Sequence, residues 1–256
     1  MSTGKPRFIL PGITSYFGGK GAPATVRRII NALPAHHVYI EPFLGSGRVL
    51  RHKRPAPGGS FGFETDPALC ATWHTCAPVD VHIVNTDALT SLEPLILALM
   101  EAGCPPEQIV TYCDPPYLMH TRRSSNLVYH REWCAEDHVK FLLLARRLPG
   151  RVLISHLPCA EYATALADWH TFTFLNSTRH GLQTEQVWCN FTPGPELHEY
   201  TFIGRDFRER ERFKRQFAII RKRFHALPPA ARIALLGMLD AHDHSDNRSS
   251  STHPTP

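Results

Sequence analysis

The sequence predicts an α/β fold in which a mostly parallel, seven-stranded sheet is covered by helices on both faces. Seven short runs rich in Val, Ile, Phe and Tyr, each followed by a polar, Gly or Pro cluster, have the length of buried strands. Helical patterns lie between several of these runs, and such alternation is typical of parallel sheets. The expected strands are 37–43, 60–65, 81–87, 108–117, 151–156, 170–176 and 185–191.

Helices between the strands are expected over 24–33, 91–101, 136–147 and 161–168. After residue 191 the pattern changes, because the Pro- and Gly-containing segment 192–195 interrupts regular structure. Phe213, Phe217, Ile220 and Phe224 then recur at helical spacing, and two prolines separate this helix from another over 230–240. We expect a main domain over 1–195, a basic helical extension over 196–241 and a disordered, Ser-rich tail over 242–256.

The positive charge is concentrated in one segment. The chain has 28 Lys and Arg against 23 Asp and Glu, and residues 205–223 hold nine basic and three acidic side chains, so the remainder sums to about −1. A near-neutral body with one basic segment differs from a protein that is basic over its whole surface. With 43% hydrophobic and 20% charged residues, the composition excludes disordered and fibrous classes.

Cysteine and histidine usage argues against several further classes. Seven cysteines without a C-x-x-C pair indicate reduced thiols, and the sequence begins without a long apolar segment, so we expect a cytoplasmic protein. The apolar runs are too short for a membrane helix. Sixteen histidines show no recognisable ligand spacing, so no metal is expected.

The segment YIEPFLGSGRVL at 39–50 predicts a strand, a glycine turn and the start of a helix. Gly45 and Gly47 lack a Cβ, which lets backbone N–H groups approach a ligand. Leu50 stands where a dinucleotide fingerprint needs a third Gly or Ala, so the NAD-binding pattern is not met. Glu64 ends the next strand, where doubly wound folds bind ribose hydroxyls. The pattern favours an adenosine without a pyrophosphate, with an ordinary tight turn as the alternative.

Asp114, Pro115, Pro116 and Tyr117 close the expected strand 108–117. Two successive prolines remove backbone donors and stiffen the turn, leaving the Pro115 carbonyl and the Asp114 carboxylate as acceptors suited to an NH2 group. A nucleobase stacked on Tyr117 would gain about 1–3 kcal/mol. A planar aromatic amine is a poor nucleophile, and two hydrogen bonds to its protons favour the tetrahedral geometry that attacks. The alternative is a rigid turn after a buried strand.

The motifs and their order resemble the Dam-type, alpha-group adenine-N6 DNA methyltransferases, in the short form of phages and mobile elements. The resemblance covers about residues 8–191 and is carried by TSYFGGKG (14–21), EPFLGSG (41–47), FET (63–65), NTD (85–87), DPPY (114–117) and by Arg122, Tyr129, Glu132, Asp137 and His138. It implies a Rossmann-like S-adenosylmethionine-dependent methyltransferase fold, with 1–195 as the catalytic domain. It also implies S-adenosyl-L-methionine as cofactor and methyl transfer to N6 of a flipped-out adenine in double-stranded DNA.

The resemblance also implies roles for individual residues. Asp114, Pro115, Pro116 and Tyr117 match the clamp on the target base. The cofactor side is matched by Tyr16, Lys20, Glu41, Phe43, Gly45, Gly47, Glu64, Asp87 and Asp114. Glu64 corresponds to the acidic ribose ligand, and Asp87 corresponds to an acidic position near the adenine ring of the cofactor.

DNA recognition departs from the larger members of that family, which insert a recognition domain between the third and fourth motifs. Only 26 residues separate Asp87 from Asp114, so such an insert does not fit. The candidate DNA contacts are the basic helix over 205–224 and the loop over 118–133, which holds Arg122, Arg123, Asn126, Tyr129 and Arg131. Both could equally be solvated surface, and the helix could also pack its Phe face against the domain.

Several alternatives stay open at this point. A cytosine-N4 or RNA exocyclic-amine methyltransferase would share the cofactor and chemistry, and a glutamine-N5 methyltransferase would carry Asn at position 114. A catalytically silent DNA-binding remnant would have lost Lys20, Gly45, Asp114 or Tyr117, and all four are present. Ser155 and His156 do not indicate a hydrolase, because no G-x-S-x-G accompanies them. We expect a monomer that binds double-stranded DNA and neither a metal nor a membrane.

Overall fold

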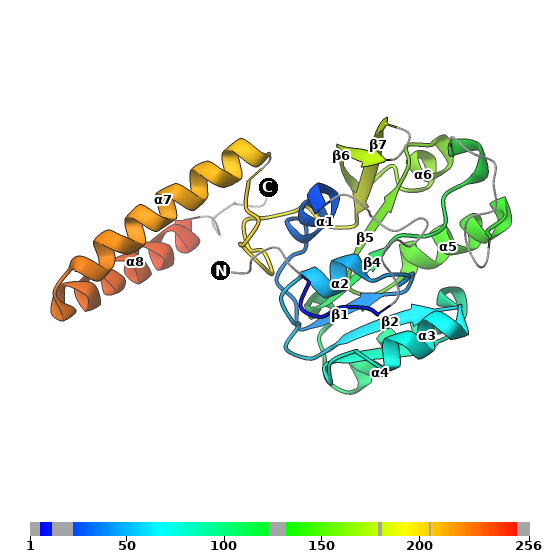
Figure 1. Cartoon of the computed structure of the whole chain (residues 1–256), viewed down its shortest axis with the longest axis horizontal. Helices are drawn as coiled ribbons and strands as arrows, with labels where there is room; N and C mark the ends of the chain where they lie inside the picture. Colours follow the sequence, from blue (N-terminus) through cyan, green and yellow to red (C-terminus); the bar gives the residue numbers. More distant parts are fainter. Residues whose placement is uncertain (1–5, 12–22, 123–131, 179–180, 205, 250–256) are drawn as a thin grey trace, which may run out of the picture. The chain divides into compact units, whose positions relative to one another are not determined.

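Seven strands form one sheet in the order β3-β2-β1-β4-β5-β7-β6 (Figure 1). The strands are β1 (Val38–Glu41), β2 (Ser60–Glu64), β3 (Val81–Asn85), β4 (Ile109–Cys113), β5 (Arg151–His156), β6 (His170–Thr178) and β7 (Gly181–Cys189). The first five run parallel, and β7 is antiparallel to both of its neighbours, β5 and β6. The expected Rossmann-like, mostly parallel sheet is confirmed, with each strand where the sequence predicted it.

The structure is a computed structural model that describes residues 6–11, 23–122, 132–178, 181–204 and 206–249, and it describes their side chains except at 177–178 and 240–249. The helices around the sheet are α1 (Pro23–Ile30), α2 (Arg48–His52), α3 (Pro67–His74), α4 (Ala88–Glu101), α5 (Ala135–Arg147) and α6 (Ala160–Ala165). Two 3₁₀ turns, η1 (Pro106–Gln108) and η2 (Met119–Thr121), flank β4. The four helices expected between strands are present, with ends shifted by a few residues.

Side chains that alternate along the strands enter two hydrophobic cores on opposite faces of the sheet. On β1, Tyr39 packs into the core that contains α1, α2 and α3. Its neighbours Val38 and Ile40 pack into the core that contains α4, α5 and α6. The helices therefore cover both faces, as the strand and helix alternation predicted (Figure 1).

The chain forms two compact units, Met1–Phe202 and Ile203–Pro256. The first unit extends past the expected boundary at residue 195, because Leu197 pairs with Pro34, the His198 N–H donates to the Leu33 carbonyl, and Phe202 is buried in the first core. The second unit consists of α7 (Phe207–Ala226) and α8 (Pro229–Ser249), and α7 buries none of its residues. Helix α8 continues past the expected end near residue 240, since the sequence has neither Gly nor Pro between 237 and 254.

The glycine turn after β1 is shaped by a tryptophan of α3. Gly45 and Gly47 have φ angles of 48° and 53°, in the left-handed region that favours glycine. The Trp73 indole N–H donates to the Gly45 carbonyl at 2.9 Å. A Cβ on Gly47 would lie 2.5 Å from two ring carbons of Trp73, which is fully buried and cannot move aside. The close approach of this ring therefore requires glycine at position 47.

Glu41 ends β1 beneath the same turn. Its side chain is 3% exposed, and its Oε2 accepts hydrogen bonds from the Tyr39 hydroxyl at 2.9 Å and from the Leu50 N–H at 3.0 Å. Burial raises the pKa of Glu41 to about 8, although both hydrogen bonds act in the opposite direction. Glu41 thus joins the end of β1 to the first turn of α2 as a largely protonated carboxyl at neutral pH.

We predict that Gly47→Ala lowers the free energy of unfolding by about 2–4 kcal/mol, because it combines a left-handed φ with a clash against Trp73. Urea unfolding followed by circular dichroism measures the change. Gly103→Ala is the matched control, since Gly103 has a φ of +91° but no atom within 4 Å of the added Cβ. Equal losses for the two variants would contradict a role for the tryptophan contact.

We predict that Glu41→Gln removes a pH dependence of stability. The folded-state pKa of Glu41 is raised, so the stability that its proton contributes is present below about pH 4.5 and is lost as the pH rises through about 8. Relative to Glu41→Gln, wild type is expected to lose on the order of a few kcal/mol over this range. Urea titrations at several pH values measure the difference, and parallel curves for the two proteins would show that Glu41 titrates normally.

Candidate active site

The two motifs that stand far apart in the sequence follow neighbouring strands of the sheet. β1 and β4 pair in parallel at the centre of the sheet, and the chain continues from β1 to β2 on one side and from β4 to β5 on the other. Such a reversal of strand order opens a crevice at the carboxyl ends of the strands, where open α/β sheets bind ligands. The glycine turn and the tetrapeptide at 114–117 therefore leave the sheet at the same point.

Glu64 ties the end of β2 to the glycine turn. Its Oε2 accepts from the Gly45 N–H and its Oε1 accepts from the Asp66 N–H, both at 2.9 Å. Burial raises the pKa of this carboxyl, and the two backbone hydrogen bonds oppose the shift. Each carboxylate oxygen has a further lone pair, so this group can accept from a ribose hydroxyl while it holds the turn.

Phe43 and Asp87 occupy different parts of the expected cofactor side. Phe43 follows β1 and packs edge-on against Trp133 and Phe141, with ring centroids 5.2 and 5.3 Å away. Asp87 follows β3 and caps α4, because its Oδ1 accepts from the Leu89 N–H at 2.9 Å. A contact between Asp87 and a cofactor adenine stays a prediction.

Asp114 follows β4 directly and is held by a hydroxyl of β5. The Ser155 hydroxyl donates to Asp114 Oδ1 at 3.2 Å and lies 2.9 Å from the hydroxyl of Tyr112. Ser155 and Tyr112 are buried, whereas Asp114 remains partly exposed. A partly exposed carboxylate that is held in this way can accept a hydrogen bond from a ligand donor without losing its orientation.

Tyr117 is held through its ring, its hydroxyl and its carbonyl. The ring lies 5.0 Å from the His156 ring at an angle of 64°, which is an edge-to-face contact. Its hydroxyl lies 3.4 Å from Oε1 of Glu185, and its carbonyl accepts from Arg122 Nε at 2.6 Å. Pro115 is buried, while Pro116 and Tyr117 are partly exposed. The tetrapeptide is thus held by contacts inside the protein while parts of Pro116 and Tyr117 remain exposed to solvent.

Arg122 lies inside the loop that was expected to contact DNA. Its side chain is 8% exposed, and its Nη2 pairs with Glu132 Oε2 at 2.7 Å. The guanidinium therefore links the Tyr117 carbonyl to Glu132, and a DNA contact by this residue stays a prediction. The other four candidates of this loop, Arg123, Asn126, Tyr129 and Arg131, lie outside the described residues, as do Tyr16 and Lys20 on the cofactor side.

The structure adds supporting residues that the sequence analysis did not assign. Ser155 and His156 end β5 beside Asp114 and Tyr117. On the hairpin of β6 and β7, Asn176 donates to Glu185 at 2.7 Å and accepts from the Thr25 hydroxyl at 2.8 Å. The sequence did offer one signal for Ser155 and His156: they are polar residues at the end of the strand RVLISH. This strand, β5, pairs with β4, so its carboxyl end lies beside Asp114.

Two further findings concern metals and membranes. Within the described parts of the chain, no group of three or more His, Cys, Asp or Glu side chains could hold a metal ion. None of the described helices is long and apolar enough to cross a bilayer.

No protein-family model and no curated protein sequence matches the chain. Solved structures do match its fold. A 23S rRNA methyltransferase is 12% identical with a TM-score of 0.41, covering 73% of this chain and 72% of its own. A magnesium protoporphyrin IX methyltransferase from Synechocystis is 13% identical (TM-score 0.42; 68% and 80%), and a dimethyladenosine transferase from Plasmodium falciparum is 9% identical (0.42; 68% and 62%). Similarity at this level assigns neither a substrate nor a cofactor to this chain.

Proposed function

We propose that this protein is an S-adenosylmethionine-dependent methyltransferase that modifies the N6 amine of adenine in double-stranded DNA. The observation that carries the proposal is the meeting of the glycine turn with Glu64 and of the clamp at 114–117 at the strand-order reversal between β1 and β4. An adenosine site and an amine-binding site at adjacent strand ends suit the transfer of a methyl group from an adenosine-containing donor to an amine.

The cofactor side fits S-adenosylmethionine. The Glu64 carboxylate stands at the end of β2 and retains lone pairs for the ribose hydroxyls, and Gly45 and Gly47 leave the turn without side chains. The third glycine of a pyrophosphate-binding motif is absent, because its position is occupied by Leu50, whose side chain is buried in the core. When bound, this cofactor supplies a methyl group activated by a positively charged sulfur.

The clamp performs the work on the base. The Asp114 carboxylate and the Pro115 carbonyl would accept hydrogen bonds from the two N6 protons. These bonds would direct the nitrogen lone pair toward the methyl group. Stacking on Tyr117 holds the adenine after it has rotated out of the duplex, and this rotation costs a few kcal/mol. If the cofactor is bound, its sulfur would give up the methyl group to N6, and Asp114 is the adjacent acceptor for the amine proton that must leave.

Helix α7 is the further candidate for binding the DNA backbone. Its basic residues include Arg212 and Lys214, which pair with Glu209 and Glu211 three residues earlier. Arg221, Lys222 and Arg223 are exposed and form no ion pair with any residue that the structure describes. Three adjacent exposed cations can contact DNA phosphates. Such contacts add affinity but do not distinguish one base sequence from another.

We predict that Asp114→Ala abolishes or reduces methylation by at least about 100-fold, because the amine loses a charged acceptor. Purified full-length protein is incubated with labelled S-adenosylmethionine and, separately, with mixed-sequence duplex DNA and RNA, and N6-methyladenine is quantified by mass spectrometry. Asp168→Ala is the control, since Asp168 is an exposed partner of Arg146. Product on RNA alone, methylcytosine alone, or undiminished product from Asp114→Ala would overturn the proposal.

We predict that replacing Arg221, Lys222 and Arg223 together by Gln flattens the salt dependence of DNA binding, with a slope that falls by about 1 to 3. Fluorescence anisotropy over a range of salt concentrations measures the slope, and cofactor affinity should not change. The control replaces Lys140, Arg146 and Arg147 of α5 by Gln, which removes the same charge from another exposed surface. An unchanged slope in the α7 variant would exclude these cations from the DNA interface.

A further inference from the structure

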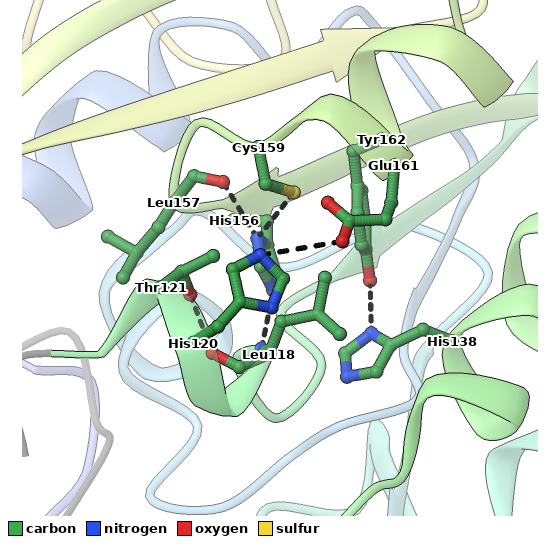
Figure 2. Close-up of polar contacts among 9 residues, drawn as sticks. All are labelled: Leu118, His120, Thr121, His138, His156, Leu157, Cys159, Glu161 and Tyr162. Atoms are coloured by element: carbon green, nitrogen blue, oxygen red, sulfur yellow. Dashed lines mark hydrogen bonds and ion pairs between the residues drawn. The ribbon is translucent and has the colours of Figure 1, made fainter. Parts of the chain in front are cut away.

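Three buried ring side chains, His156, Tyr162 and His138, lie together near Leu118 (Figure 2), and His156 also contacts the Tyr117 ring of the clamp. His156 ends β5, Tyr162 belongs to α6 and His138 belongs to α5. Each of the three is at most 2% exposed. The proposed transfer assigns no role to them, yet burying two imidazoles and a phenol next to a site requires compensating contacts.

The hydrogen bonds of His156 define one form of its ring. The Leu118 N–H donates to His156 Nε2 at 3.0 Å, so Nε2 is the unprotonated acceptor. His156 Nδ1 lies 2.8 Å from the Leu157 carbonyl, which only accepts, so Nδ1 carries the proton. The contacts therefore require a neutral imidazole, since a protonated ring has no acceptor nitrogen.

The bond from Leu118 matters because the clamp is poor in backbone donors. Pro115 and Pro116 have no N–H, so Tyr117 and Leu118 carry the first backbone donors after Asp114. Leu118 is 6% exposed, and an unpaired N–H at such a site costs about 1–3 kcal/mol. The Leu118 carbonyl is bound as well, by the N–H and the hydroxyl of Thr121 at 3.0 and 2.7 Å. Both polar groups of the residue after the clamp are thus satisfied inside the protein.

The His156 ring is itself immobilised by aromatic contacts. It stacks on Tyr162 with centroids 4.3 Å apart and an interplanar angle of 14°. The Tyr162 hydroxyl lies 2.9 Å from His138 Nδ1, and burial lowers the pKa of His138 to about 4, so that ring is neutral near pH 7. His138 meets Trp133 edge-on at 5.2 Å, and Trp133 meets Phe43 at 5.2 Å. Ring contacts therefore run without a break from the clamp to the loop after β1.

We propose that His156 is a positioning residue for the target base: its Nε2 holds the Leu118 backbone and its edge contact holds the Tyr117 ring, so that the clamp meets the base in one orientation. This inference rests on the proposed function and adds a residue to it. His156 acts through Tyr117 and Leu118, and Tyr162 acts through the stacked His156 ring. Loss of the Nε2 acceptor should therefore lower the rate of transfer more than it lowers cofactor binding.

Two substitutions separate the acceptor from the ring. His156→Phe keeps a ring against Tyr162 but has no acceptor, and we expect its kcat to fall on the order of 10- to 100-fold with cofactor affinity unchanged within about twofold. His156→Gln offers a side-chain oxygen at the reach of Nε2, and it should recover most of the loss. His156→Asn is too short to reach Leu118 and should resemble His156→Phe, which keeps the test valid if the Phe variant fails to fold.

His36→Phe is the matched control. His36 is also buried and neutral, with Nδ1 2.7 Å from the Pro34 carbonyl and its ring stacked on His198. It precedes β1, however, and therefore lies near the amino-terminal ends of the parallel strands, whereas His156 lies at the carboxyl-terminal end of β5. Its kcat should stay within about twofold of wild type. Equal losses in the His36 and His156 variants, or a Gln variant no better than Phe, would overturn the positioning role.

A spectroscopic readout tests the contact independently of activity. Nitrogen-15 spectra of the wild-type imidazole should show the Nδ1–H form near pH 7, and the Leu118 amide should exchange slowly with solvent in wild type and His156→Gln but rapidly in His156→Phe. If wild type methylates no DNA while these signals are as expected, the proposed function fails and the contact stands. Rapid Leu118 exchange in wild type, or an Nε2–H ring, would overturn the inference whatever the activity.

Discussion

β1 and β4 pair in parallel, with Val38 opposite Ile109 and Ile40 opposite Thr111, and this pairing sets the position of everything in the candidate site. Both strands are buried on their two faces, so a one-residue slip would move a whole set of apolar side chains out of its core. The loops that follow the two strands therefore both begin at the carboxyl-terminal ends of the parallel strands. The glycine turn and the tetrapeptide at 114–117 thus follow paired strands although they lie far apart in the chain.

Each of these loops is held by the strand on its outer side. Glu64, at the end of β2, accepts from the Gly45 N–H of the loop after β1. Ser155 and His156, at the end of β5, bind Asp114 and Leu118 in the segment after β4. The inner strands thus lead into the proposed ligand-binding groups, and the last residues of the neighbouring strands form the hydrogen bonds that orient these groups. Rigid support of this kind is what catalysis by positioning requires.

Charge and chemistry are separated along the chain. The first unit holds the sheet, both cores and the candidate site. The excess positive charge lies in α7 of the second unit, where most side chains are exposed. In protein–DNA recognition, contacts to phosphates position the protein, whereas contacts to bases select the sequence. Under the proposed function, α7 would provide the first kind of contact and the segments around the clamp the second.

The order of strands and helices, the glycine turn and the clamp at 114–117 were predictable from the sequence, because they depend on local periodicity and on residue types within a few positions. The arrangement of the strands within the sheet came only from the resemblance. Ser155 was considered only as a hydrolase residue, and its contact with Asp114, 41 residues earlier, could not be predicted from the sequence. The inward position of Arg122 was equally unpredictable, since it depends on Glu132 across a loop. Sequence by itself determined which groups could meet the substrate, whereas tertiary structure decided which buried neighbours hold them, because those hydrogen bonds exist only after distant strands have paired.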